Sequence, residues 1–343
     1  GFAQEVATHL GTDHRTMDFS PTDAAKSLDE LLTAKDEPLA DPSLLVTQHL
    51  CRQSGLKVAL GGDGGDEAWL GYPTFAVHGV AAALSHLPAG VRRAAAQAGR
   101  RLPPSEHNIA ATEQARRFLD GLAGPNDLRV LTWIGGLPPD QFRTVHAPAH
   151  NTGQTDAWDD VVGWGAPVPM VQRLAARLHA EGHTGLNGER ALLGRTYLSE
   201  GVLQKVDRAS MAHGVEVRAP WLDRDVLALS AALPPELLLG PRRLGLRTGK
   251  IIPRALASRL LPKRVGIRPK KGFGVPLSAW LRGPLAPRLQ HDLRPSAVAQ
   301  VPGLRPEQVS ALVTAHLSGR ADHRKTLFAL WRLVIWWRNA VTS

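Results

Sequence analysis

The chain has 343 residues, of which 43% are hydrophobic and 21% are charged. This composition excludes a disordered tail and a collagen-like fibre, and the chain is long enough to bury a large core. Its one cysteine, Cys51, excludes an internal disulfide framework and a multi-cysteine zinc site. A single thiol fits a reducing compartment, so we expect a cytoplasmic protein. Uninterrupted apolar runs are only a few residues long, so we expect no membrane-spanning segment.

The net charge is +10, from 41 Lys and Arg against 31 Asp and Glu. Such a basic balance suits nucleic acid, a membrane surface or a polyanionic small ligand such as ATP. The charge is uneven, because residues 13–66 are rich in acids and residues 242–294 are rich in Lys and Arg. An acidic segment facing a basic one is what a metal–polyphosphate site needs: carboxylates for Mg²⁺ and cations for phosphate oxygens.

The first 60 residues alternate helical and extended patterns. The expected elements are a helix over residues 3–10, a short strand over 14–19, a helix from Ser20 to Leu32, a helix capped by Ser43 that ends near Gln53, and a strand over 57–60. The last strand leads directly into a glycine-rich loop, residues 61–67. This order is typical of an α/β sheet whose ligands bind at the carboxyl ends of its strands.

The rest of the chain is mostly helical in pattern. Helices are expected over residues 80–101, 112–122, 172–180, 189–212, 250–260, 308–317 and 324–339, with a long loop or hairpin over 147–169 and an irregular cationic segment over 262–276. The last helix interleaves aromatic and basic side chains that could stack nucleic-acid bases, namely Trp331, Arg332, Trp336, Trp337 and Arg338. Apolar residues at helical spacing favour a helix docked on the core instead.

The loop over residues 61–67 carries the first candidate chemistry. Its four glycines let the backbone approach a ligand closely. Asp63, Asp66 and Glu67 would repel one another unless a cation or hydrogen-bond donors offset their charge. Mg²⁺ prefers one or two carboxylates together with phosphate oxygens, which this loop can supply. The alternative is an acidic surface turn.

Two charged segments follow. Residues 263–276 place five cations around Pro269, and a Lys held over a polyphosphate stabilises the charge that develops as pyrophosphate leaves. A solvated basic loop is the alternative for this segment. Residues 205–223 alternate acidic and basic side chains, for which we favour structural pairing.

Four motifs in order resemble the synthetase domain of glutamine-hydrolysing asparagine synthetase. Residues 36–43 resemble the family's DEP-x-x-D-x-S segment, residues 61–72 its SGDGGDE-x-x-x-GY loop, residues 205–223 its K-x-DR-x-SM-x-x-x-x-E-x-R-x-P-x-LD segment, and residues 268–281 its R-x-K-x-GF-x-x-P-x-x-x-W-L segment. Together they span nearly the whole chain.

The resemblance implies a fold and a division of the chain. The fold is an α/β, adenine-nucleotide α-hydrolase-like arrangement of the pyrophosphatase-loop type, a parallel sheet flanked by helices with a helical extension. Residues 1–343 then form one ligase domain. Its approximate parts are a nucleotide- and substrate-binding α/β region (1–75), a helical and loop insertion (76–185) and a helical region with the catalytic basic loop (186–343).

The resemblance also implies a reaction. ATP and aspartate give β-aspartyl-AMP and pyrophosphate, and ammonia, from glutamine in the full enzyme, then displaces AMP. The implied sites are Lys270 and Asp63 as catalytic residues, Gly61, Gly62 and Gly64 at the nucleotide, Asp41, Ser43 and Glu67 at the substrate, and Asp66 as the Mg²⁺ ligand.

The sequence departs from the family's pattern in three ways. The SGGxDS pyrophosphate loop, expected just before residues 3–10, is absent from the 343 residues, and so is the glutaminase domain with its terminal Cys. We therefore expect the chain alone to be an incomplete catalytic unit, with the glutaminase domain as its covalent partner. Gly61 stands where the family usually has Ser. Cys51 cannot replace the nucleophile, because it lies within an expected helix, and we interpret it as a packed thiol.

Two other readings of the function stay open. Related ligases that close β-lactam rings, cyclise lasso peptides or amidate other carboxylates share the activation chemistry, and the fold does not decide the acceptor. A non-catalytic basic binding module is the second reading. A second copy of the chain is a further candidate partner, whereas nucleic acid and a membrane are not expected.

Overall fold

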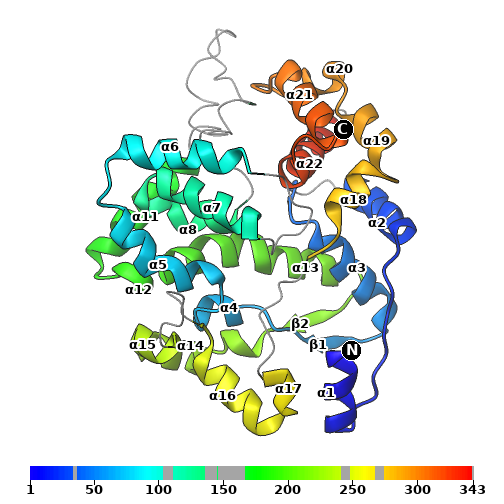
Figure 1. Ribbon diagram of the computed structural model, residues 1–343. Helices are drawn as coiled ribbons and strands as arrows, with labels where there is room; N and C mark the ends of the chain where they lie inside the picture. The colour runs from blue at the N-terminus through cyan, green and yellow to red at the C-terminus, as the bar shows by residue number, and fades with distance from the viewer. Residues whose placement is uncertain are drawn as a thin grey trace. The chain divides into compact units, whose positions relative to one another are not determined.

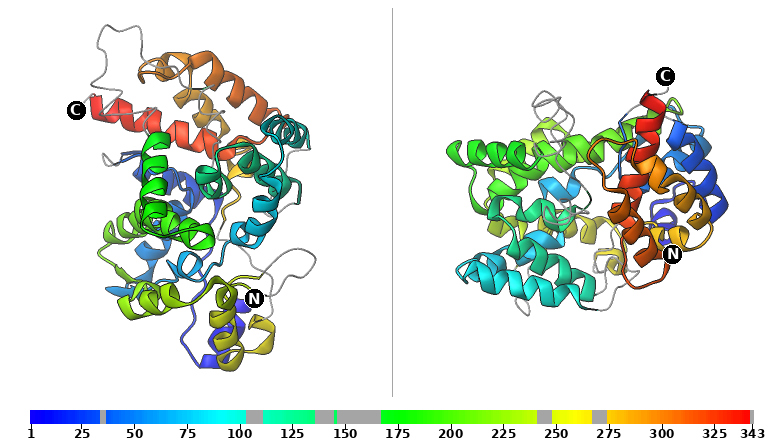
Figure 2. Two further views of the ribbon diagram at one scale, coloured as in Figure 1. Left: turned by 90° about the vertical axis from the view of Figure 1, so that its left-hand side faces the viewer. Right: turned by 90° about the horizontal axis from the view of Figure 1, so that it is seen from above.

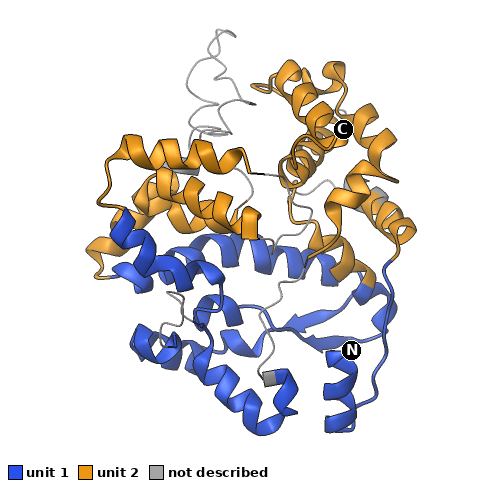
Figure 3. Ribbon diagram, viewed as in Figure 1, with its two compact units in different colours: residues 1–19, 50–84, 183–273 blue, residues 20–49, 85–182, 274–343 orange. Residues whose placement is uncertain are grey.

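The computed structural model describes residues 1–33, 37–102, 111–135, 145, 167–240, 248–266 and 274–341. These residues are mostly helical, with one small parallel sheet (Figure 1). The chain divides into two units, each assembled from three separate stretches (Figure 3). Unit 1 contains residues 1–19, 50–84 and 183–273, and unit 2 contains residues 20–49, 85–182 and 274–343.

The sheet belongs to unit 1 and pairs β1 (Val58–Leu60) with β2 (Glu216–Arg218) in parallel. Val58 lies opposite Glu216, and Leu60 lies opposite Arg218. One further backbone bond, from the Gly61 N–H to the Arg218 carbonyl at 2.7 Å, extends the ladder past β1. The expected strand is thus confirmed. Because the strands run the same way, the loops that follow them leave from the same edge of the sheet.

Helices make up the remainder of unit 1. They are α1 (Phe2–Leu10), α4 (Gly65–Ala68), α5 (Pro73–Leu84), α12 (Gly185–Leu193), the π-helix η2 (Gly194–Leu203), α13 (Gln204–Met211), the 3₁₀ turn η3 (Pro220–Leu222), α14 (Arg224–Ala232), α15 (Pro235–Leu238), α16 (Ile251–Leu260) and α17 (Lys263–Gly266).

The expected helix over residues 189–212 is continuous but not uniform. Its central part, η2, has π-helical hydrogen bonds between two α-helical ends. Near its start the Thr196 hydroxyl donates to the Leu192 carbonyl at 2.6 Å. A side-chain donor at this carbonyl competes with the backbone N–H that an α-helix would use. Hydrophobic spacing does not distinguish the two helix types.

The regular elements of unit 2, among its described residues, are helices. It contains α2 (Pro21–Thr33), the first half of α3 (Ser43–Ser54), α6 (Ala89–Arg100), α7 (Ala111–Ala123), the 3₁₀ turn η1 (Asn126–Leu128), α8 (Arg129–Ile134), α11 (Pro167–Ala180), α18 (Leu277–Arg282), α19 (Ala286–Asp292), α20 (Pro295–Val298), α21 (Pro306–Leu317) and α22 (Arg324–Val341). In both views of Figure 2, α19, α21 and α22 lie together.

Reciprocal capping starts α2 as the sequence predicts. The Ser20 N–H donates to the Asp23 carboxylate at 2.9 Å, and the Asp23 N–H donates to the Ser20 hydroxyl at 3.1 Å. This arrangement satisfies backbone donors that have no partner inside the helix.

The last helix is docked, as its spacing predicts. On α22, Trp331 and Arg332 are buried, and the Trp331 indole N–H donates to the Asp292 carboxylate at 2.9 Å. Leu327 and Val334 are buried on the same helix. A ring that is enclosed in this way has no face left for a nucleic-acid base, so the stacking interpretation does not hold for Trp331.

Some of the expected elements are wrong, wholly or in part. Residues 14–19 have no regular structure, because no described strand lies beside them to complete a ladder. The helix over residues 80–101 is broken between α5 and α6, where Pro88 has an extended backbone. Ser43 is the first residue of α3 rather than its cap, since the Asp41 carboxylate accepts the Ser43 N–H at 2.9 Å. Of the expected loop over 147–169, residues 167–169 begin α11, and the rest lies outside the described residues.

Cys51 is a buried free thiol in α3, as expected, and burial raises its pKa. Over the described part of the chain, no helix combines the length and apolar character that crossing a bilayer requires.

A buried polar cluster ties α18 and α21 to the start of α22. The Asp322 carboxylate accepts hydrogen bonds from the Ser278 hydroxyl at 2.9 Å and from the Arg324 guanidinium at 2.6 Å. Beside it, His316 is fully buried, and its Nδ1 accepts the His323 N–H at 3.2 Å. Burial lowers the pKa of His316 to about 4. The neutral imidazole is therefore the folded form.

We expect this histidine to make stability depend on pH. Its pKa falls from 6.5 to about 4 on folding, so the unfolded chain takes up the proton first as the pH falls. Stability should decrease by up to about 3 kcal/mol between pH 6.5 and pH 4. Burial also lowers the pKa of His323, which acts in the same direction. Urea unfolding across this range measures the effect. In His316→Asn, whose amide oxygen can still accept the His323 N–H, the loss should be smaller; an unchanged loss would contradict the assignment.

Candidate active site

The acidic loop, residues 61–67, begins where β1 ends and runs into the short helix α4. Gly64 precedes α4 with a left-handed backbone, at φ 79°. Asp63 and Asp66 are half-buried, whereas Glu67 is buried. The structure therefore brings the three predicted carboxylates and the predicted glycines together on one turn at the carboxyl edge of the sheet.

The turn after β2 covers the loop from one side, which explains two of its glycines. A Cβ at Gly64 would overlap the Leu222 side chain, and one at Gly65 would lie 3.1 Å from the Trp221 ring. At Gly61 a Cβ would lie 2.7 Å from the Asp63 carboxylate and 3.0 Å from Val217. Gly62 is exposed and has open space beside it.

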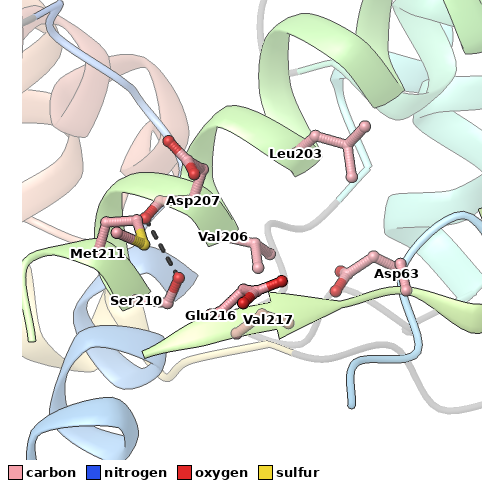
Figure 4. A pocket seen from close by; sticks show the side chains of 9 residues that line it. Asp63, Leu203, Val206, Asp207, Ser210, Met211, Glu216 and Val217 are labelled. Carbon is pink, nitrogen blue, oxygen red and sulfur yellow. Dashed lines mark hydrogen bonds between the residues drawn. The ribbon is translucent and has the colours of Figure 1, made fainter. Parts of the chain in front are cut away.

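Asp63 lines a cavity of about 190 Å³ between the loop, β2 and α13 (Figure 4). Three carboxylates line it, those of Asp63, Asp207 and Glu216, together with the Ser210 hydroxyl and apolar side chains. Arg218 lowers the pKa of Glu216 through a hydrogen bond of 2.9 Å, so this carboxylate keeps its charge. The cavity is negatively charged, and it suits a small cationic group or water better than a phosphate.

Asp66 is held by a lysine that comes from a distant part of unit 1. The Lys250 ammonium lies 3.0 Å from Asp66 Oδ1, and the two side chains are 29% and 22% exposed. Solvent still reaches the carboxylate, so it remains available to a further cation.

Glu67 faces away from solvent and bonds within the protein. The Tyr72 hydroxyl donates to Glu67 Oε1 at 2.6 Å, and the Tyr72 ring packs edge-on against Tyr197, with ring centroids 6.1 Å apart. Burial raises the pKa of Glu67. This contact links the middle of the loop motif over residues 61–72 to its last residue and gives Glu67 a structural function.

The other predicted site residues lie elsewhere. Asp41 and Ser43 belong to unit 2, where the Asp41 carboxylate caps α3. Lys270 lies in residues 267–273, outside the described residues. Unit 2 also holds Lys325, a residue that the sequence analysis did not select. Burial lowers the pKa of Lys325 to about 8, and the charge of Asp41 opposes this shift.

The donor set of the loop fits a magnesium ion shared with phosphates. Among the described residues, no cluster of three or more His, Cys, Asp or Glu side chains is arranged to enclose a metal ion. Mg²⁺ in nucleotide sites needs only one or two carboxylates, because substrate oxygens and water complete its coordination. Asp66 is partly exposed and can therefore supply one of these carboxylates.

Sequence reasoning missed Lys250 and the cavity carboxylates Asp207 and Glu216. Lys250 stands far from the loop in the sequence, and it precedes an ordinary amphipathic helix. Asp207 and Glu216 lie in the segment over residues 205–223, whose charges we interpreted as structural pairs. The Arg218–Glu216 pair confirms this for one of them. Asp223 likewise has a structural function, since it caps α14 by accepting the Asp225 N–H at 2.9 Å.

Gly62 and Gly64 should differ sharply in their tolerance of a methyl group. In Gly64→Ala the left-handed backbone alone should cost about 1–3 kcal/mol, and the overlap with Leu222 adds to it. In the matched control, Gly62→Ala, the change should stay within about 0.5 kcal/mol because nothing lies near the added carbon. Urea unfolding of both variants measures the difference. Equal stability of the two would refute this description of the loop.

Comparison with known proteins agrees with the motifs. The family model described as asparagine synthase matches residues 1–338. A Mycobacterium bovis protein with the provisional name asparagine synthetase (glutamine-hydrolysing) is 26% identical over 339 residues, which cover 96% of this chain and 47% of the relative; a Mycobacterium tuberculosis protein matches equally. Asparagine synthetase (glutamine-hydrolysing) 1 of Bacillus subtilis is 22% identical over 343 residues, covering 97% and 49%. The chain thus spans about half the length of these relatives. The resemblance inferred from the motifs is confirmed, and the chain belongs to the asparagine synthase family.

Proposed function

We propose that the chain is the ligase part of an enzyme that makes asparagine from aspartate, ATP and ammonia, with ammonia supplied by glutamine in the complete protein. The observation that carries the proposal is the acidic glycine loop at the carboxyl end of β1 in a chain that the family matches almost throughout. The proposal includes an adenine-nucleotide α-hydrolase-like fold, of which the parallel pair β1–β2 would be a part.

The proposed reaction has two steps. In the first, an oxygen of the aspartate side-chain carboxylate attacks the α-phosphorus of ATP, the bond from that phosphorus to the bridging oxygen breaks, and pyrophosphate leaves. In the second, the nitrogen of ammonia attacks the activated carbonyl carbon, the bond to the AMP oxygen breaks, and the nitrogen loses a proton. The products are asparagine, AMP and pyrophosphate.

The residues of the loop would have different functions because their environments differ. Gly61, Gly62 and Gly64 let the backbone lie against the nucleotide. Asp66 would hold Mg²⁺, which when bound neutralises charge on the phosphates. Asp63 borders the negatively charged cavity, where it can orient the substrate or accept the proton that ammonia loses.

Residues outside the loop would complete the site. Lys270 would stabilise the negative charge that develops on the α-phosphate and on the leaving pyrophosphate. Asp41 and Ser43 would contact the amino-acid substrate. Glu67 supports the loop through its hydrogen bond with Tyr72. Its contact with the substrate would be an additional function.

One experiment separates this proposal from its alternatives. The chain, and a version extended by whatever coding sequence precedes Gly1 in its gene, are assayed for pyrophosphate release with ATP, Mg²⁺, ammonia and a panel of carboxylates. Release that depends on aspartate, with asparagine as the product, supports the proposal. Release with another carboxylate alone would favour a tailoring ligase. No release with any carboxylate, together with steeply salt-dependent DNA binding, would favour a binding module.

Lys270 should be essential in the form that is active with aspartate. Lys270→Ala should reduce aspartate-dependent pyrophosphate release by about 10²–10³-fold, since a cation at developing phosphate charge is lost. Lys271→Ala, at the neighbouring position, is the matched control and should keep most of the activity. If both variants keep it, the assignment of Lys270 is wrong.

Asp66 should set the magnesium requirement. Asp66→Asn removes a charged ligand, so the Mg²⁺ concentration at half-maximal pyrophosphate release should rise at least several-fold. Asp225→Asn changes a well-exposed carboxylate on α14 and should leave the titration unchanged. A titration of Asp66→Asn that overlies that of the unmodified protein would remove Asp66 from the metal site.

A further inference from the structure

A short segment at the start of α16 packs against the acidic loop and the residues that follow it. Among the described residues, only Leu70 and Lys250 combine a side chain with a left-handed backbone, at φ 51° and 57°. The two lie together, since the Lys250 N–H donates to the Trp69 carbonyl at 3.0 Å. Two unfavourable backbone conformations at one junction indicate that the surrounding structure requires them.

Close backbone packing explains why the junction is built this way. A Cβ at Gly249 would overlap the Leu70 carbonyl oxygen, and a Cβ at Gly71 would overlap both the Asp66 carboxylate and the Lys250 stem. The missing side chains thus make the room in which Lys250 reaches Asp66. We call residues Asp66, Leu70, Gly71, Gly249 and Lys250 the lysine clasp.

The clasp supplies a cation to the carboxylate that the proposed function assigns to Mg²⁺. The Lys250 ammonium lies 3.0 Å from Asp66 Oδ1, within ion-pair distance. The neighbouring charge is that of Glu67, which interacts electrostatically with both Asp66 and Lys250 and is buried behind them. A divalent cation that approaches Asp66 therefore meets the positive charge of Lys250, a repulsion that grows as the distance shortens.

We propose that Lys250 is a positioning residue of the acidic loop that competes with a divalent cation for Asp66. In the absence of metal it holds the carboxylate in place, and it yields part of this contact when the metal binds. The inference rests on the proposed function of Asp66 as a metal ligand. Lys250 thereby keeps Asp66 from binding a metal ion tightly before phosphate oxygens contribute to its coordination.

The lysine clasp also joins the acidic loop to α16. Replacement of Lys250 by a metal ion at Asp66 would therefore affect this connection. The Lys250 carbonyl accepts the Arg254 N–H at 2.8 Å in the first turn of α16. From α16 the chain continues through α17 into the basic segment that carries Lys270. Lys250 is therefore the point where the acidic loop contacts the stretch leading to the basic segment.

Direct metal binding to the 343-residue chain tests the inference without any activity measurement. The probe is Mn²⁺ alone, and the free ion is measured by electron paramagnetic resonance. Lys250→Met removes the ammonium and keeps most of the stem. Lys250→Gly removes it and suits the left-handed backbone, so it remains informative if the first variant does not fold. Lys250→Arg keeps the charge and is the matched control.

We expect Lys250→Met and Lys250→Gly to bind Mn²⁺ at least threefold more tightly than the unmodified chain, and Lys250→Arg to bind like it. Adding Asp66→Asn to either neutral variant should abolish the gain, because the gain acts through that carboxylate. Unchanged or weaker binding in the neutral variants overturns the inference, as does a gain that survives Asp66→Asn or an absence of Mn²⁺ binding in every variant. Failure of the proposed ligase activity would appear separately, as pyrophosphate release without aspartate dependence.

Discussion

The parallel pairing of β1 with β2 is the constraint on which the site depends. It joins residues 58–60 to residues 216–218, which are distant in the sequence, and directs both following turns to one edge of the sheet. The turn after β2 then packs Trp221 and Leu222 against the glycines of the acidic loop. Without this pairing, the loop would be a flexible acidic turn on the surface. With this pairing, the glycine-rich loop has a defined conformation.

The three carboxylates of the acidic loop lie in different surroundings at this edge of the sheet. Asp63 opens toward a cavity shared with Asp207 and Glu216, whereas Asp66 is neutralised by Lys250. Glu67 lies deeper and is satisfied by the Tyr72 hydroxyl. The repulsion among the three neighbouring carboxylates is partly offset because each has a different surrounding: solvent and the cavity for Asp63, a lysine for Asp66, and a phenol for Glu67. Under the proposed function, this separation of environments would let one short loop serve binding, support and proton chemistry.

Much of the fold and part of the site could be predicted from the sequence. Helical spacing predicted α21 and α22, and Ser20 with Asp23 predicted the start of α2, because these signals are local. The motif over residues 61–72 predicted the acidic loop for the same reason. Lys250 could not be found, since its partner lies far away in the sequence and only close backbone packing reveals the contact. The prediction of a strand over residues 14–19 is wrong, because a strand needs a neighbouring strand to pair with, and the local sequence does not show whether one is present.

Gly61 also determines where the Asp63 side chain can lie. The space that a Cβ at this position would need is taken by the Asp63 carboxylate and the Val217 side chain. A serine there would require Asp63 to adopt another rotamer and Val217 to shift by a few tenths of an ångström. Both of these side chains line the cavity beside the loop. The absence of a side chain at position 61 therefore helps to define the shape of that cavity.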